Sequence, residues 1–320
     1  MDNADQLITI VIPVRNRAGI ITRTLDSIVR QDCRDFRLVV VDNASTDDTK
    51  DVVNNWIAGH RSCGISIELL DEPHPGASAA RNRGLAATDT PYVMFFDSDD
   101  EMRSNHLSRI TAELRRRPDT ELLRWDVGIL DPDGWLHVKS PHFHDEIQLN
   151  ILHGSLSTIR YVVRTDLLRA AGAWNEDLST WDDMELGNRL LISGIAVSKL
   201  NGEPSVVIHI TPDSITGSSY SERIESMTRA LDAIERTLRE SPEADADYLN
   251  TIDSRRAITA AILTREGNIK AAKSLMATAL NGHRRSERTK LRLIKTFSRV
   301  FGRGGSMLAL FLFGKKAEKR

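Results

Sequence analysis

Cysteine is scarce in this sequence: its 320 residues include only two, Cys33 and Cys63. Two cysteines do not make a disulfide framework, and their separation does not match the ligand spacing of a zinc site. We therefore expect two half-buried thiols and a reducing, cytoplasmic environment for the protein.

The sequence also lacks a long apolar run and a strong net charge. The purely apolar run at residues 307–313 is far shorter than the roughly 20 residues of a membrane span. The first residues, MDNADQ, have neither the basic nor the apolar part of a signal peptide. A formal net charge of -2 gives no overall field that attracts nucleic acid, so we expect no nucleic-acid partner.

The first hundred residues contain a regular alternation of strand-like and helix-like segments. Strand patterns at residues 7–14, 36–41, 65–70 and 92–96 alternate with helical patterns at 18–30, 48–58 and 77–87. Apolar, β-branched runs without a polar side are typical of parallel strands that are covered on both faces. The order therefore predicts an α/β fold with a doubly wound, mostly parallel sheet and helices on both faces.

The pattern continues less regularly and then becomes purely helical. We expect a helix at 106–116, strands within 122–138, a strand at 159–164, helices at 165–171 and 182–191, and a strand at 204–210. From residue 222 onward only helical spacing remains, with a break at SPEAD and a hairpin that turns at 266–268. We expect a catalytic domain at residues 1–218 and a small helical domain at 219–320.

Residues 290–320 form a basic amphipathic tail with an apolar end. Such a segment can lie on an anionic membrane surface, which would place the protein peripherally on the inner face of the membrane. It can equally dock on the catalytic domain or on another subunit of a homo-oligomer, because amphipathic spacing does not identify the partner.

Polar clusters stand at the predicted ends of three strands: Arg15-Asn16, Asp42-Asn43 and the acidic run DSDD at residues 97–100. In doubly wound sheets, ligands bind beyond the carboxyl ends of the strands. Neighbouring carboxylates repel one another unless a cation neutralises them, and carboxylate oxygens suit Mg²⁺ or Mn²⁺. The alternative is a solvated acidic turn that caps the following helix.

Four segments occur in a characteristic order: TIVIPVRNRAGIITRTLDSI, VVVDNASTDDT, PGASAARNRGL and YVMFFDSDD. With them the chain resembles the family 2 inverting glycosyltransferases of the GT-A fold, over about residues 7–216. The resemblance implies a Rossmann-like mixed sheet, a nucleotide-sugar donor, Mn²⁺ or Mg²⁺, and a glycan or lipid-linked acceptor. A UDP-sugar is favoured by family tendency, whereas no residue pattern indicates which sugar is transferred.

The same resemblance assigns residues to the donor site. The donor-binding residues that it implies are Pro13, Val14, Arg15, Asp42, Arg81 and Asp97, and the metal ligand in DSDD is Asp99. A carboxylate at Asp42 can accept a nucleobase N–H, and the planar fork of Arg81 suits phosphate oxygens. The alternatives are an Asx-turn at Asp42 and a surface salt bridge at Arg81.

The segment GAWNEDLSTWDDMELGNRLL matches the family's acceptor-side motif, with Asp182-Asp183 in place of a Glu-Asp pair. The alignment implies that Asp183 is the general base, and a helix N-terminus would keep that carboxylate ionised. The alternative is simple capping of the helix by one of the two aspartates. Trp181 either stacks on a sugar or fills the core, whereas Trp174 is expected in the core.

The last family element is matched only in part, by VIHITPDSIT. His209 is either a metal ligand or diphosphate contact, or a structural histidine at a strand end. Two rival functions remain: a nucleotidyltransferase, although PVRNRAG lacks the glycine density of that class, and a catalytically silent binding or scaffold protein. The histidine-rich stretch at 137–154 lacks metal-site spacing and is expected to form an acceptor loop.

Overall fold

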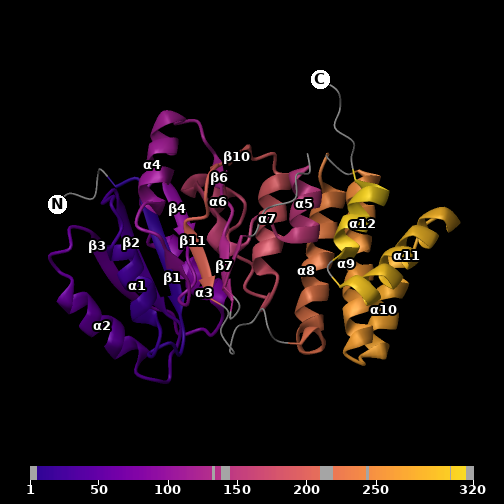
Figure 1. Cartoon of the computed structure of the whole chain (residues 1–320), viewed down its shortest axis with the longest axis horizontal. Helices are drawn as coiled ribbons and strands as arrows, with labels where there is room; N and C mark the ends of the chain where they lie inside the picture. Colours follow the sequence, from indigo (N-terminus) through magenta and orange to yellow (C-terminus); the bar gives the residue numbers. More distant parts are fainter. Residues whose placement is uncertain are drawn as a thin grey trace. The chain divides into compact units, whose positions relative to one another are not determined.

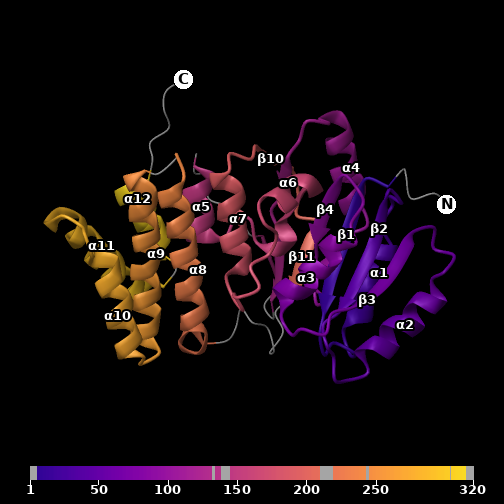
Figure 2. The ribbon, with the colours of Figure 1, turned by 180° about the vertical axis from the view of Figure 1, so that it is seen from behind.

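A computed structural model describes residues 6–131, 134–137, 145–209, 219–242, 245–302 and 304–314 (Figures 1 and 2). The chain forms two compact units. The sheet unit consists of Met1–Ser140, Leu156–Glu176 and Ile195–Thr211, and the helical unit of Pro141–Ser155, Asp177–Gly194 and Pro212–Arg320. The expected domain boundary near residue 218 stays a prediction, and residues 177–194 group with the helical unit.

The main sheet of the sheet unit has seven strands in the order β10-β6-β9-β4-β1-β2-β3. The strands are β1 (Ile8–Val14), β2 (Phe36–Asp42), β3 (Ser66–Asp71), β4 (Tyr92–Phe95), β6 (Leu122–Arg124), β9 (Tyr161–Arg164) and β10 (Val197–Lys199). Neighbouring strands are parallel except at β9, which runs antiparallel to both β4 and β6. The predicted mixed, mostly parallel sheet is therefore confirmed.

Helices cover both faces of this sheet. Alternate β1 residues such as Ile8 and Ile10 share a core with side chains of α1 (Ile21–Val29), α2 (Thr49–Gly59) and α4 (His106–Arg116). On the opposite face α3 (Ala77–Ala86) packs against β1, with Gly84 directly over Val11. The apolar runs of the sequence are thus buried on both sides, as their lack of a polar face indicates.

A second sheet in the same unit has the strand order β5-β11-β7-β8. Its strands are β5 (Glu101–Met102), β11 (Val206–His209), β7 (Gly128–Asp131) and β8 (Gly134–His137). The expected strands within 122–138 and 204–210 are confirmed, as is the helix α6 (Thr165–Ala170). Residues 132–133 of the expected DPDG turn lie outside the described residues. The short strands β5 and β10 were not predicted, because two or three residues show no periodicity.

The helical unit contains α5 (Glu146–His153), α7 (Asp182–Ile192), α8 (Tyr220–Glu240), α9 (Ala246–Arg265), α10 (Ile269–Leu280), α11 (Arg285–Phe301) and α12 (Gly304–Phe313). The predicted hairpin turning at 266–268 is confirmed as α9 and α10, and α8 ends at the predicted break beside Ser241. Across the described ranges, no helix combines the length and the apolar composition needed to cross a bilayer.

The helix α5 corrects one expectation. Residues 146–153 were expected in a histidine-rich acceptor loop, but they are helical and mostly buried. The Asp145 side chain accepts the N–H of Gln148 at 2.9 Å, and Gly154 ends the helix with a φ of 62°. An aspartate before and a glycine after an apolar run are ordinary helix boundaries, so this signal was available in the sequence.

Candidate functional site

The first part of the site is the shared carboxyl edge of β1 and β2. Val14 pairs with Asp42 in the parallel ladder, and the Val14 carbonyl accepts the N–H of Asn43 at 2.8 Å. Because the two strands end in register, Pro13, Val14 and Asp42 lie at one edge of the sheet. Arg15 follows directly and is exposed. The structure therefore brings these four predicted donor-site residues together.

Asp42 is a buried carboxylate at this edge, only 5% exposed. Its Oδ2 accepts the N–H of Ser45 at 3.2 Å, which is the turn geometry expected of an aspartate that follows a strand. Its Oδ1 is buried and has no hydrogen-bond donor among the described residues. The turn alternative is thus realised by one oxygen, while the second remains available for a nucleobase N–H.

Asn43, the next residue, was missed as a site residue. Its amide nitrogen donates to the carbonyls of Glu72 and His74, at 3.3 and 2.7 Å, and its Oδ1 accepts the N–H of Gly76 at 2.7 Å. One buried side chain therefore holds the loop that leads into α3. The available signal was a polar residue directly after a buried strand, but its partners lie about thirty residues away.

Arg81 on α3 is buried, with 7% of its surface exposed. Its guanidinium lies 4.4 Å from the ring centroid of Trp174, and its Nη2 is 3.4 Å from Oδ1 of Asp97. The alternative of a surface salt bridge is therefore wrong, because the helix face that carries Arg81 is internal. Trp174 is 2% exposed, which confirms its expected place in the core.

The acidic run at residues 97–100 follows β4 and is fastened to α1. Nη2 of Arg23 donates to the Asp99 carbonyl at 2.6 Å. The Thr24 hydroxyl lies 3.0 Å from the Ser98 carbonyl and 2.8 Å from the Asp100 carbonyl. The sequence does not identify Arg23 and Thr24 as site residues, because the apolar spacing of this helix gives no information on its polar contacts. They fix the backbone so that the four residues project their side chains from a defined loop.

Carboxyl groups are crowded in this loop. Asp100 is 4% exposed, and its burial, followed by the charges of Asp97 and Asp99, raises the pKa of its carboxyl to about 8. Its Oδ1 accepts the backbone N–H of His209 at 3.0 Å, which joins β11 to the acidic loop. Crowded carboxylates of this kind are stabilised when positive charge is bound beside them.

His209 lies at the end of β11, close to the acidic loop. Its Nε2 is buried, 3.7 Å from Oε1 of Glu101, and burial, ahead of the charge of Arg23, lowers the pKa of the imidazole. A neutral imidazole suits a metal ligand.

The described ranges contain no group of three His, Cys, Asp or Glu side chains placed to enclose a cation. Mg²⁺ is nevertheless usually bound by one or two carboxylates together with substrate phosphates. The donor set Asp99 and His209, beside the crowded carboxylates of the acidic loop, fits a cation that is completed by a diphosphate.

Asp183 belongs to the helical unit. α7 begins at Asp182, and the preceding Trp181 has a φ of 59° and gives no side-chain cap. Oδ1 of Asp183 accepts the N–H of Met184 at 2.7 Å. The carboxylate therefore lies in the first turn, where the helix dipole favours its ionised form. Its meeting with Asp99 stays a prediction, and its capping role remains an open alternative.

Trp181 packs within the helical unit rather than standing free. The guanidinium carbon of Arg255 lies 4.6 Å from the centroid of its ring, and the Tyr220 ring meets it edge-on at 6.1 Å. The indole remains partly exposed. The ring therefore packs among side chains of the helical unit and keeps some exposed surface, whereas its stacking on a sugar stays a prediction.

Comparison with known proteins gives a consistent result. The sequence model of "Glycosyl transferase family 2" matches residues 9–169, slightly more than half of the chain. A "PGL/p-HBAD biosynthesis glycosyltransferase" of Mycobacterium bovis (strain BCG / Pasteur 1173P2) is 32% identical over 125 residues, which are 39% of this chain and 48% of that protein. The chain thus matches about half the length of this curated relative.

Two solved structures share the fold. The crystal structure of S. aureus TarS 1-349 in complex with UDP-GlcNAc has a TM-score of 0.72 and 17% identity, and the match covers 98% of this chain and 93% of that one. The mannosyltransferase PcManGT from Pyrobaculum calidifontis, in complex with GDP-Man and Mn²⁺, has a TM-score of 0.60 and 18% identity, over 98% and 90%. At these identities the likeness concerns the fold.

Proposed function

Because the chain belongs to glycosyl transferase family 2, we propose that it moves a sugar from a nucleotide-diphosphate donor to an acceptor hydroxyl, with inversion at the anomeric carbon. The donor is a UDP-sugar carrying a hexose or N-acetylhexosamine. The acceptor is a glycan or a lipid-linked molecule in the synthesis of a surface polysaccharide or glycolipid. The reaction takes place in the cytoplasm, where the free cysteines Cys33 and Cys63 stay reduced.

The single observation that supports this function most is the convergence at the sheet edge. Asp42 at the end of β2, Arg81 on α3 and the acidic loop after β4 stand where a doubly wound sheet binds its ligand. Buried charge of both signs at that edge matches a donor that has a nucleobase, a diphosphate and a sugar. A scaffold protein would not require Arg81 to be buried beside Asp97.

Each donor-side residue has a chemically suited task. Oδ1 of Asp42 accepts the nucleobase N–H, and the backbone of Pro13, Val14 and Arg15 borders the base and ribose. The Arg81 guanidinium, which lies over the ring of Trp174, faces the base or diphosphate. Asp97 serves the ribose side of the donor. Uracil has an N–H that the Asp42 carboxylate can accept, and we favour a uridine donor over guanosine or thymidine because of the family tendency.

Asp99 and His209 would hold a divalent cation, Mn²⁺ or Mg²⁺, together with the donor diphosphate. When bound, the cation stabilises the negative charge that develops on the leaving nucleoside diphosphate. The protein's own part is to keep the acidic loop in place through Arg23 and Thr24. The PcManGT structure, a complex with GDP-Man and Mn²⁺, supports a metal in a protein of this fold.

Asp183 takes the acceptor proton. Its ionised carboxylate removes the hydroxyl proton while that oxygen attacks the anomeric carbon from the face opposite the diphosphate. The new bond to carbon forms as the bond to the phosphate oxygen breaks, and the electron pair leaves with the nucleoside diphosphate. One displacement without an enzyme nucleophile inverts the anomeric configuration.

The test is a screen of nucleotide sugars for binding and hydrolysis with Mn²⁺ or Mg²⁺, followed by transfer assays with the best donor. Asp183→Asn should reduce transfer by a factor of about 100 or more and leave donor binding near that of the wild type. Asp182→Asn, one residue away on the same turn, is the matched control and should keep most activity. Full transfer by Asp183→Asn would remove this residue from the role of base, and binding of no nucleotide sugar would refute the function.

A further inference from the structure

The C-terminal helices present an unusual concentration of exposed apolar side chains. Eight large apolar side chains are exposed in the described part of the chain, and six of them lie on α11 and α12. These six are Leu293, Phe297, Val300 and Phe301 on α11, and Met307 and Phe311 on α12, which we call the apolar tip. Their exposed fractions range from 38% at Phe297 to 84% at Phe311. Isolated exposed apolar residues are ordinary, whereas such a group marks an interaction surface.

The exposure does not arise from an undocked helix, because α11 has a separate buried side. Leu291, Ile294 and Ser298 are fully buried and belong to the side that packs on α9. A Cβ on Gly305 would lie 1.7 Å from the Ser298 Oγ, so α12 also approaches α11 closely. The apolar residues of α11 therefore form two sides of the helix. One side packs inside the helical unit, and the other is exposed.

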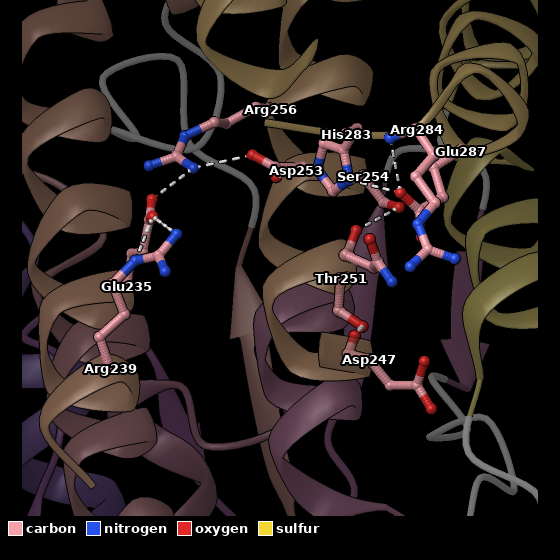
Figure 3. Close-up of polar contacts among 11 residues, drawn as sticks. Glu235, Arg239, Asp247, Thr251, Asp253, Ser254, Arg256, His283, Arg284 and Glu287 are labelled. Atoms are coloured by element: carbon pink, nitrogen blue, oxygen red, sulfur yellow. Dashed lines mark hydrogen bonds and ion pairs between the residues drawn. The ribbon is translucent and has the colours of Figure 1, made fainter. Parts of the chain in front are cut away.

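The attachment of α11 is also fixed by polar contacts at its start, as Figure 3 shows. Nε2 of His283 is 2.7 Å from Oδ2 of Asp253 on α9, and Nδ1 of His283 is 3.3 Å from Oε2 of Glu287. Glu287 also accepts the backbone N–H of Arg284 at 3.0 Å. These bonds hold the first turn of α11 on α9. The side that carries the apolar tip is therefore held outward.

Basic side chains accompany the apolar tip on the same helix. Arg288, Arg292 and Arg299 are exposed on α11. The single acidic residue of that helix, Glu287, is already bonded at its N-terminus. Within the described residues none of these three arginines pairs with a carboxylate, so α11 combines protruding apolar side chains with unpaired positive charge. Apolar groups beside Arg and Lys are the composition that binds an anionic lipid surface.

We propose that α11 and α12 dock this protein on an anionic membrane surface, with the apolar tip inserted among the lipids and the α11 arginines on the headgroups. A second copy of the chain is a poorer occupant, because a symmetric contact would place the same arginines against each other. The side chains also protrude instead of lining a pocket. Lipid accepts protruding apolar groups directly, whereas a protein partner must offer a matching cavity. The inference does not depend on the assignment of Asp183.

The experiment uses the full chain and vesicles of phosphatidylcholine with or without 30% phosphatidylglycerol, and measures the protein that floats with the lipid. We expect binding to the anionic vesicles that exceeds binding to the neutral ones by a factor of ten or more. The apolar variant Val300→Ser/Phe301→Ser/Phe311→Ser and the charge variant Arg288→Gln/Arg292→Gln/Arg299→Gln should each lower binding at least tenfold. All six positions are exposed, so both variants should fold.

The matched control is Leu130→Ser, which removes an exposed apolar side chain from β7 and should leave binding unchanged. Equal binding of the wild type and the apolar variant would overturn the proposal. So would equal binding to neutral and anionic vesicles. Light scattering of the same proteins without lipid tests for a dimer. If the wild type does not bind vesicles but forms a dimer, and the apolar variant is monomeric, the surface binds a second copy of the chain and the proposal is wrong.

Discussion

The hydroxyl of Ser226 holds the backbone of Thr180 from both sides. Its Oγ accepts the Thr180 N–H at 3.2 Å and lies 3.3 Å from the Thr180 carbonyl, to which it can donate. The same oxygen accepts the N–H of Ser179 at 3.0 Å. A side chain of α8 therefore fixes the segment that ends three residues later at Asp183. The helices that follow the sheet unit in sequence thus contribute to placing the proposed base.

Replacing Ser226 with alanine should slow the chemical step selectively. Two backbone N–H groups lose their acceptor, and the segment before α7 gains freedom. We expect kcat to fall about tenfold or more, because small displacements of a catalytic group are costly. The donor KM should stay within about twofold, because the donor-side residues belong to the sheet unit. Steady-state kinetics with varied donor separate the two parameters.

Thr228→Ala provides the control for this prediction. Thr228 lies on the same helix, but within the described residues its hydroxyl bonds only the Ile224 carbonyl of its own helix, at 2.7 Å. Its loss should leave kcat nearly unchanged. If Ser226→Ala keeps full kcat while Asp183→Asn is inactive, the base is correct and the positioning role of Ser226 is wrong.

Gly84→Ala should destabilise the sheet unit. A Cβ at this position would lie 2.2 Å from Cγ1 of Val11, inside a packed face. Overpacking of this kind costs about 1–3 kcal/mol. The double variant Gly84→Ala/Val11→Ala should recover part of that loss, because the two sites are in direct contact. Gly19→Ala, with no atom within 4 Å of the new Cβ, should be neutral, and chemical denaturation compares all four proteins.

Local sequence patterns predicted most of this fold because its strands are buried on both faces. The run of β1 has no polar side, and its short length and β-branched residues indicate a strand that is covered on both faces. The same patterns predicted that Asp42 and Asp97 lie at strand ends: Asp42 is the last residue of β2, and Asp97 comes shortly after β4. Their role in donor binding stays a prediction. Such patterns indicate whether consecutive residues are buried or exposed, and in these strands consecutive residues are buried alike.

Contacts between distant segments could not be predicted in the same way. Thr24 was counted only as part of a helix, yet its hydroxyl contacts residues 98 and 100, and Ser226 contacts residue 180. The sequence position of a single serine or threonine does not indicate which distant residue its hydroxyl will contact. The burial of Arg81 was missed for a related reason, because its apolar cover is Trp174 on another segment.

Arg256→Met should strongly destabilise the helical unit. Arg256 is 2% exposed, and its guanidinium lies 2.7 Å from a carboxylate oxygen of Asp232. It also lies 2.7 and 2.8 Å from carboxylate oxygens of Glu235 and Asp253 (Figure 3). Removing the cation takes from three carboxylates the partner that they share, among them Asp253, whose side chain is only 12% exposed. Loss of one partner of a buried ion pair typically costs about 3–5 kcal/mol. The thermal unfolding temperature is the measurement.

Arg239→Met is the matched control for Arg256. Arg239 pairs with the same Glu235, but its side chain is 59% exposed and the pair is one helical turn apart. Exposed pairs of that kind contribute at most about 0.5 kcal/mol. If the two variants lose equal thermal stability, the burial of Arg256 does not make its ion pairs stronger than the exposed pair of Arg239, and the prediction is wrong.

His106 should make the stability of the sheet unit depend on pH. Its ring is fully buried, with Nδ1 2.8 Å from the Ser205 hydroxyl and an edge contact to Trp125 at 4.7 Å. Burial, followed by the charge of Arg109, lowers the pKa of this histidine from 6.5 to about 3. Above pH 6.5 the imidazole is neutral in both states, so its contribution to stability is constant there.

Below pH 6.5 His106 is protonated in the unfolded chain but stays neutral in the folded one. The free energy of unfolding therefore decreases as the pH falls. The slope approaches about 1.4 kcal/mol per pH unit until the folded pKa is reached. Between pH 7.5 and 5.0 the wild type should therefore lose about 2 kcal/mol more than His106→Gln, which cannot titrate. Denaturant unfolding followed by tryptophan fluorescence gives both values. Parallel losses in the two proteins would mean that His106 is protonated without unfolding the unit.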